Sequence, residues 1–98
     1  MRVEVSRRAQ RSIERIDARW RRHADYPNIF IDEMVAAVEH LETVAHPGTP
    51  CHSRMRPGLR RMVLEKTKCH LYFAVNERKH QIELLQVWDG RRERPPKL

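Results

Sequence analysis

The sequence predicts an α+β fold, a helical hairpin packed on an antiparallel sheet in the order β-α-α-β-β-β. Three observations predict it: a short alternating segment opens the chain, two segments with helical periodicity follow, and three strand-like runs with short polar connections come last. The 98 residues suit one domain. We divide it into a strand (1–6), a helical hairpin (7–45), a loop (46–58), a three-strand meander (59–89) and a basic tail (90–98).

The first strand and the first helix are predicted between Arg2 and Ala24. Residues 2–6 alternate polar and apolar side chains, as a short strand does, and Ser6 suits the N-cap of a following helix. Apolar residues then recur at steps of four, three and four, which places them on one helical face. They are Ala9, Ile13, Ile16 and Trp20. We expect this face, including Trp20, to lie in the core.

The second helix is predicted to begin near Pro27, which suits a first helical turn, and to stop before His46-Pro47-Gly48. Its apolar stripe consists of Phe30, Met34, Ala37, Val38, Leu41 and Val44. Two helices of about 17 residues with a short connection form an antiparallel hairpin.

The second half of the chain reads as a loop followed by a meander. Residues 46–58 are rich in Pro and Gly and have no period, so they are a candidate functional loop. Three strand-like runs follow, Leu59–Glu65, Cys69–Asn76 and Gln81–Asp89. Alternation places apolar residues on both faces of this sheet. One helical layer covers one face, so the other is covered by loop and tail or offers a groove to a partner.

In the last run the same alternation places Ile82 and Leu84 opposite Leu85 and Val87. We therefore assign Leu85 and Val87 to the face that the helices do not cover.

The charge pattern points to an anionic partner. The net charge is +7 and the isoelectric point is near 10.2, values that suit a nucleic acid, a nucleic-acid machine or an acidic protein. Residues 25–48 carry five acidic residues and no Lys or Arg, between two basic segments.

Several classes of protein are not expected. No stretch approaches the roughly 20 apolar residues of a membrane span, and no secretory leader precedes the first periodic segment. Two cysteines make no disulfide framework, which favours the cytoplasm. Cys69 and His70 are adjacent strand residues that face opposite ways, so we expect no metal site, and no cofactor.

The chain resembles the RelE/ParE superfamily of toxins from bacterial type II toxin–antitoxin modules, and the resemblance covers nearly its whole length. The matching positions are spread along the predicted elements. They are Val3, Ser6 and Ala9; Ile13, Ile16 and Trp20; Gly58-Leu-Arg-Arg; Leu71-Tyr-Phe-Ala-Val; and Val87-Trp88-Asp-Gly-Arg91-Arg92 with Pro96 and Leu98. The resemblance implies a growth-inhibiting toxin of the β-α-α-β-β-β type, associated with plasmid stabilisation and neutralised by a cognate antitoxin that is often acidic.

The resemblance implies two possible mechanisms. RelE-like members cut messenger RNA in the ribosome without a metal, and their basic positions fall on Arg61, His70 and Arg91 here. They also carry a Tyr or His near the C-terminus, which this chain lacks after Trp88. ParE-like members bind and poison DNA gyrase without enzymatic activity, and we favour this interpretation. A plain nucleic-acid-binding module is a third and weaker hypothesis, because no recognition-helix signature is present.

The predicted contact residues form two groups. Those expected to meet the target are Arg60, Arg61, Trp88, Arg91, Arg92 and Arg94, because Arg60 and Arg61 lie on one strand, Arg91 and Arg92 follow another, and neighbouring strands would bring them together. Trp88 could stack on a base or on Arg92, although packing against the helices is the role that we favour. The antitoxin is expected to cover the second apolar face through Tyr72, Ala74, Leu85 and Val87.

Overall fold

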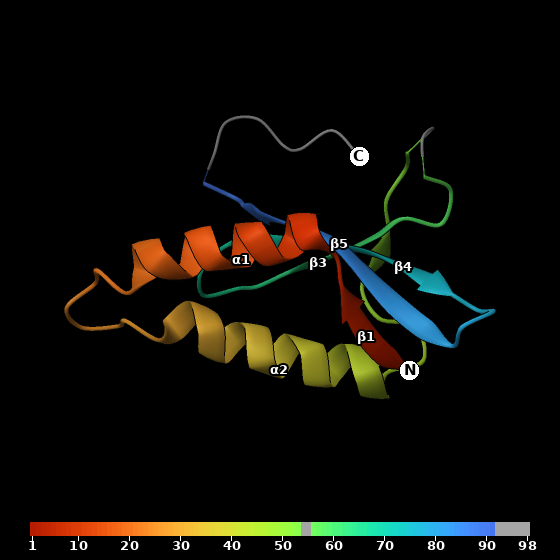
Figure 1. Cartoon of the computed structure of the whole chain (residues 1–98), viewed down its shortest axis with the longest axis horizontal. Helices are drawn as coiled ribbons and strands as arrows, with labels where there is room; N and C mark the ends of the chain where they lie inside the picture. Colours follow the sequence, from red (N-terminus) through yellow and green to blue (C-terminus); the bar gives the residue numbers. More distant parts are fainter. Residues whose placement is uncertain (54–55, 92–98) are drawn as a thin grey trace.

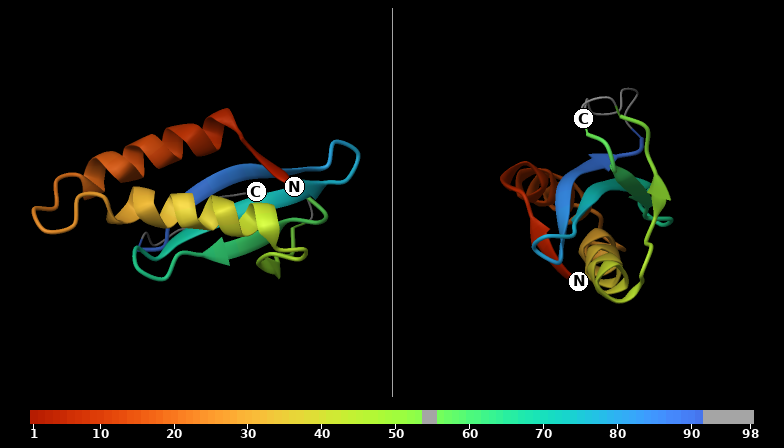
Figure 2. Two further views of the ribbon diagram at one scale, coloured as in Figure 1. Left: turned by 90° about the horizontal axis from the view of Figure 1, so that it is seen from below. Right: turned by 90° about the vertical axis from the view of Figure 1, so that its right-hand side faces the viewer.

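The computed structural model describes residues 1–53 and 56–91 and confirms the α+β fold class. Helices α1 (Arg7–Trp20) and α2 (Ile29–Thr43) lie side by side on one face of a five-stranded sheet (Figures 1 and 2). The strands are β1 (Arg2–Val5), β2 (Thr49–Pro50), β3 (Arg60–Val63), β4 (Cys69–Asn76) and β5 (Gln81–Asp89). Within these described ranges, no helix is long and apolar enough to cross a membrane.

Both helices are shorter than the sequence predicts. The Ser6 hydroxyl accepts a hydrogen bond from the Ala9 amide (3.0 Å), so the predicted N-cap of α1 is confirmed. Helix α1 ends at Trp20 and not near Ala24, because the polar residues after Trp20 have no apolar side chain to bury, and packing stabilises most protein helices. Helix α2 begins at Ile29, two residues after Pro27.

The sheet has the order β1-β5-β4-β3-β2 and is mixed, which corrects the predicted antiparallel sheet. Strand β1 pairs in parallel with β5, and the other neighbouring strands are antiparallel. Ser6 extends this parallel pairing, because its amide donates to the Leu84 carbonyl and its hydroxyl donates to the Leu85 carbonyl. These bonds fasten the start of α1 to the middle of β5.

The predicted loop 46–58 contains the short strand β2, which pairs Thr49 with Arg61. Gly48 has a positive φ of 66°, and a side chain there would collide with the Arg61 carbonyl oxygen. Glycine therefore allows the close approach that starts this strand.

The core lies between the helices and the sheet, as the hairpin pattern predicts. From the helices it contains Ala9, Ile16, Phe30, Met34, Ala37 and Leu41, and from the sheet Cys69, Leu71, Phe73, Ile82, Leu84 and Val87. Ile13 and Trp20 are partly buried against it.

The position of Val87 in this core is a correction. Tyr72 pairs with Gln86 while Phe73 pairs with Leu84, so Leu85 is one extra residue on β5. Such a β-bulge shifts the alternation of side chains by one. Val87 therefore joins Ile82 and Leu84 on the helix-covered face and is 2% exposed.

Candidate functional site

The sheet face opposite the helices, called the outer face below, carries a row of aromatic rings beside an arginine. Arg61 lies opposite Tyr72, and Val63 lies opposite His70 on the neighbouring strand. The His70 ring stacks with Tyr72 (6.4 Å between centroids) and meets Trp88 edge-on (4.9 Å). Arg61 and Val63 are exposed, whereas Tyr72 is buried outside the main core cluster. We call Arg61, His70, Tyr72 and Trp88 the outer-face cluster.

The environment of His70 keeps its imidazole neutral near pH 7. Burial lowers the pKa of His70, and the positive charge of Arg61 lowers it further. His70 Nδ1 and Trp88 Nε1 are both buried, and neither has a hydrogen-bond partner among the described residues. Buried polar atoms usually have partners, and exceptions often occur at functional positions. The outer-face cluster thus offers a free cation, a neutral imidazole and an indole donor.

Arg91 is held at the end of β5 by Asp89, which is 4% exposed. Its Nε and Nη2 each donate to an Asp89 carboxylate oxygen at 3.3 Å, and its guanidinium lies 5.1 Å from the centre of the Trp20 ring in α1. Arg19 of α1 is a second cation on the same carboxylate (3.4 Å). Asp89, Arg91, Trp20 and Arg19 therefore fasten the end of the sheet to α1.

The protonation of Asp89 reflects these partners. Burial acts to raise the pKa of Asp89, but the hydrogen bonds from Arg91 and the charges of Arg91 and Arg19 outweigh it and lower that pKa. Asp89 is therefore ionised at neutral pH and pairs with both arginines.

Gly90 joins this end of the sheet to the outer-face cluster. A Cβ atom at Gly90 would lie far inside contact distance of the Lys68 carbonyl oxygen and 2.9 Å from His70 Nε2. The Gly90 amide also donates to the Lys68 carbonyl (2.8 Å). Glycine is therefore required for the backbone to pass against His70.

The predicted convergence of Arg60 and Arg61 with Arg91 is wrong for the residues that the structure describes. Strand β4 lies between β3 and β5, so the two arginine-bearing strands are not neighbours. Arg60 faces away from Arg61 and donates to the carbonyls of Pro47 (2.7 Å) and Gly48 (3.0 Å). Arg92 and Arg94 lie outside the described residues.

Two further sequence predictions are revised by the geometry. Trp88 contacts His70 in the outer-face cluster and is not packed in the helical core, and the cation–π contact joins Arg91 to Trp20. The four residues assigned to an antitoxin differ in exposure: Tyr72 (5%) and Val87 (2%) are buried, whereas Ala74 and Leu85 are partly exposed. Contact of these four residues with an antitoxin stays a prediction.

Neither cysteine belongs to the outer-face cluster, although Cys69 precedes His70 and lies opposite Asp89. Cys69 is buried in the core, and burial raises the pKa of its thiol. Across residues 1–53 and 56–91, no three His, Cys, Asp or Glu side chains gather as metal ligands would.

Comparison with known proteins gives structural likenesses only. No protein-family model and no curated protein sequence matches the chain. A chain from the chromosomal ParDE TA system of P. aeruginosa is similar, with a TM-score of 0.71, 22% identity and coverage of 91% of this chain and 95% of that one.

Two E. coli structures are also similar. The isolated RelE toxin has a TM-score of 0.59 at 16% identity, covering 93% of this chain and 85% of that one. A chain of the intact RelBE toxin-antitoxin complex has a TM-score of 0.55 at 18% identity, covering 92% and 96%. The predicted RelE/ParE-like fold is thereby confirmed.

Proposed function

We propose that this protein belongs to the RelE/ParE toxin superfamily and is the toxin of a type II toxin–antitoxin module, which inhibits DNA gyrase by binding it. Two observations on the whole chain support the toxin assignment. Its fold is similar over more than 90% of its length to chains of the ParDE TA system and the RelBE toxin-antitoxin complex. Its net charge of +7 suits an acidic antitoxin.

The observation that favours gyrase binding over RNA cleavage is the position of Arg91. A metal-independent ribonuclease needs a base, an acid and cations together at one phosphate. Of the three residues that the resemblance implies for this role, Arg61 and His70 share the outer face. Arg91 is bound to Asp89 and Trp20 at the end of α1. The cationic outer face therefore suits binding better than catalysis.

One observation supports the ribosome-dependent ribonuclease as a second candidate. His70 is neutral at pH 7 and lies beside the free cation of Arg61, as a general base beside a phosphate-binding group would. In that case His70 would accept the proton of the RNA 2′-hydroxyl, and Arg61 would stabilise the phosphate.

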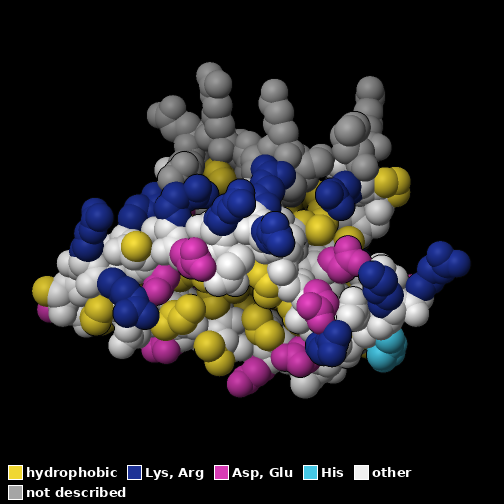
Figure 3. All heavy atoms as spheres, viewed as in Figure 1, with side chains coloured by type: hydrophobic (Ala, Val, Ile, Leu, Met, Phe, Trp, Pro, Cys, Tyr) yellow, Lys and Arg dark blue, Asp and Glu magenta, His cyan; other side chains and the backbone are white. Residues whose placement is uncertain are grey.

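The antitoxin has a basic surface to bind. Figure 3 shows Lys and Arg side chains in a row over α1, with most Asp and Glu side chains below them. The exposed arginines of α1 with no ion pair among the described residues are Arg7, Arg8, Arg11 and Arg15. An acidic segment would be steered to this side, so added salt should slow its association more than it speeds dissociation.

Two assays on the purified protein separate the mechanisms. We expect the wild type to inhibit gyrase supercoiling and to leave ribosome-bound messenger intact. If the wild type cleaved messenger RNA and the cleavage rate fell about 100-fold in His70→Ala, the result would contradict gyrase binding and support the ribonuclease mechanism. The module itself is tested by a search for a small reading frame beside the gene, whose product should restore growth upon co-expression if it is the cognate antitoxin.

A further inference from the structure

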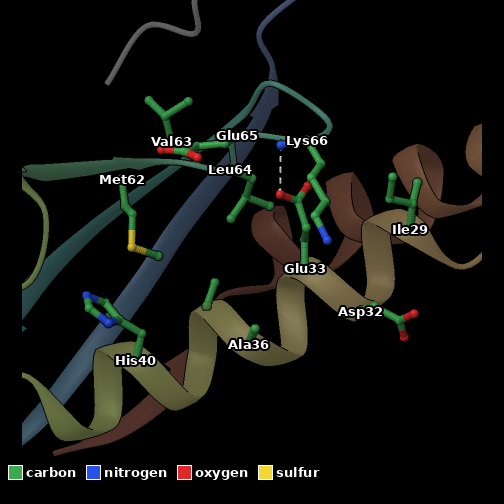
Figure 4. Close-up of a pocket in the computed structure, with 11 residues that line it drawn as sticks. Ile29, Asp32, Glu33, Ala36, His40, Met62, Val63, Leu64, Glu65 and Lys66 are labelled. Carbon is green, nitrogen blue, oxygen red and sulfur yellow. Dashed lines mark hydrogen bonds between the residues drawn. The ribbon is translucent and has the colours of Figure 1, made fainter.

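A groove of about 530 Å³ lies between α2 and the strand β3, and none of the four residues of the outer-face cluster lines it (Figure 4). This volume is in the range of protein ligand sites. Met62 points from β3 toward the helix, and Ile29 and Ala36 of α2 add apolar surface. The groove is thus an apolar channel with one wall from a helix and one from a strand.

The end of this groove is rigidly built. The Glu33 carboxylate of α2 accepts hydrogen bonds from the Lys66 amide (2.9 Å), the Thr67 amide (3.0 Å) and the Thr67 hydroxyl (2.8 Å). Figure 4 shows Glu33 reaching across to Lys66. These bonds fix the turn after β3 against α2, so the channel is formed before any ligand arrives.

The strand wall offers an unpaired backbone edge. The Leu64 amide donates to the Cys69 carbonyl, so the backbone N–H and C=O groups of the even-numbered residues of β3 point toward β4. The Leu59 carbonyl accepts a hydrogen bond from the Cys51 amide, so the backbone groups of the odd-numbered residues point toward β2. Strand β2 begins at Thr49, opposite Arg61, so no described strand pairs with the amide and carbonyl of Val63. The edge is therefore open at this one residue, whose amide and carbonyl can pair with the backbone of a partner segment.

The charge of the groove differs from that of the whole molecule. Among its lining residues Asp32, Glu33 and Glu65 are acidic, against one lysine, Lys66. The remaining ionisable lining residue is His40. Although the chain as a whole has a net charge of +7, the lining of this channel is acidic. The channel is therefore suited to a cationic ligand.

We propose that this groove binds an extended, basic segment of a partner protein, which adds as an antiparallel strand beside Val63. Its alternate side chains would enter the channel against Met62, and its Lys or Arg side chains, which point to the opposite side of the segment, would meet Glu65. An acidic antitoxin would not supply the basic side chains that this groove suits. The proposed binding of a basic segment is therefore separate from the proposed toxin function, and it can be tested independently of that function.

The probe is an acetylated, amidated Lys-Val-Lys-Val-Lys-Val hexapeptide, titrated into the isotopically labelled full chain and followed by amide chemical shifts. We expect saturable shifts at Val63 and Glu65 below about 1 mM peptide, the affinity range of a short segment. The Val63→Pro variant removes the edge donor where proline is tolerated and should weaken binding about tenfold. Val63→Ala keeps the amide and is the matched control.

The contribution of the acidic lining residues to peptide binding is tested with charge-reversing variants. Glu65→Lys should weaken binding severalfold, whereas Glu77→Lys, an exposed change in the β4–β5 turn, should not. A Glu-Val-Glu-Val-Glu-Val peptide should not bind. If Val63→Pro fails to fold, protection of the Val63 amide from hydrogen exchange by the basic peptide gives the same test in wild type. Equal binding of both peptides, equal binding to Val63→Pro and Val63→Ala, or no shift at Val63 would each overturn the proposal.

Discussion

The two faces of the sheet use similar residues differently, and the neighbours Arg60 and Arg61 show this most directly. Arg60 lies on the helix-covered face, where its guanidinium donates to the carbonyls of Pro47 and Gly48. Arg61 lies on the outer face, where it is exposed beside His70 and has no ion pair within the described part of the chain. Arg60 stabilises the fold, and Arg61 is the one that we propose contacts a target.

The same contrast holds for the aromatic residues. Trp20 packs on the core and under Arg91, so its ring is part of the joint between helix and sheet. Trp88 lies beside His70 on the outer face, outside the main core cluster. The indole nitrogens of both tryptophans are buried without a hydrogen-bond partner among the described residues, so the contrast lies in what the two rings contact. Trp20 holds the helix to the sheet, and Trp88 belongs to the outer-face cluster.

The largest effect on stability is expected on the helix-covered face. Ile16 is 2% exposed and lies in the core cluster. Truncating Ile16→Ala should lower the free energy of unfolding by about 2–5 kcal/mol, because it leaves a cavity between α1 and the sheet. Denaturant unfolding measures this. Unfolding at the wild-type midpoint would show that α1 does not pack on the sheet through this residue.

A smaller effect is expected where the two faces meet, at Gly90. Substituting Gly90→Ala places a methyl group against the Lys68 carbonyl and His70. The displacement should cost about 1–3 kcal/mol, the usual range for overpacking. Thermal unfolding measures the loss, and amide shifts of His70 and Trp88 should move with it. Wild-type stability with unchanged shifts would contradict the close approach.

The smallest effect is expected from the titration of His70. Its pKa is lowered in the folded state, so the unfolded chain binds the proton more tightly. Stability should therefore fall as the pH drops below the ordinary histidine range. Asp89, whose folded pKa is lowered, should lose its contribution only in more acidic solution.

The His70→Gln variant separates this effect from that of the other histidines. Its melting temperature should fall less than that of wild type between pH 7.5 and 5.5. An identical fall in both proteins would show that His70 takes up a proton equally well in the folded and unfolded states.

The sequence predicts the fold well because its signals are local. Apolar spacing from Ala9 to Trp20 defines the buried side of α1, and Ser6 marks its start. The site is harder to predict because it depends on pairing between distant strands. Nothing near Arg60 in the sequence shows that β4 separates β3 from β5, or that the carbonyls of Pro47 and Gly48 receive its guanidinium.

The β-bulge at Leu85 is the reason that the sequence pattern places Val87 on the wrong face of the sheet. One extra residue reverses the alternation after it, so Val87 moved to the core although the sequence pattern places it on the outer face. The role of Asp89 cannot be seen in the sequence either, because its partner Arg19 belongs to a helix far away in the chain.

The most direct test of the contrast between the two faces compares Arg60→Ala with Arg61→Ala in melting temperature and in growth arrest upon induction. Arg60→Ala should leave two carbonyls without their donor and lower the melting temperature by about 5 °C, the shift for roughly 1 kcal/mol in a domain of this size. Arg61→Ala should melt within about 1 °C of wild type, because exposed charges contribute little to stability, and should abolish growth arrest. Full growth arrest by Arg61→Ala at wild-type stability would contradict the assignment of the outer face to target binding.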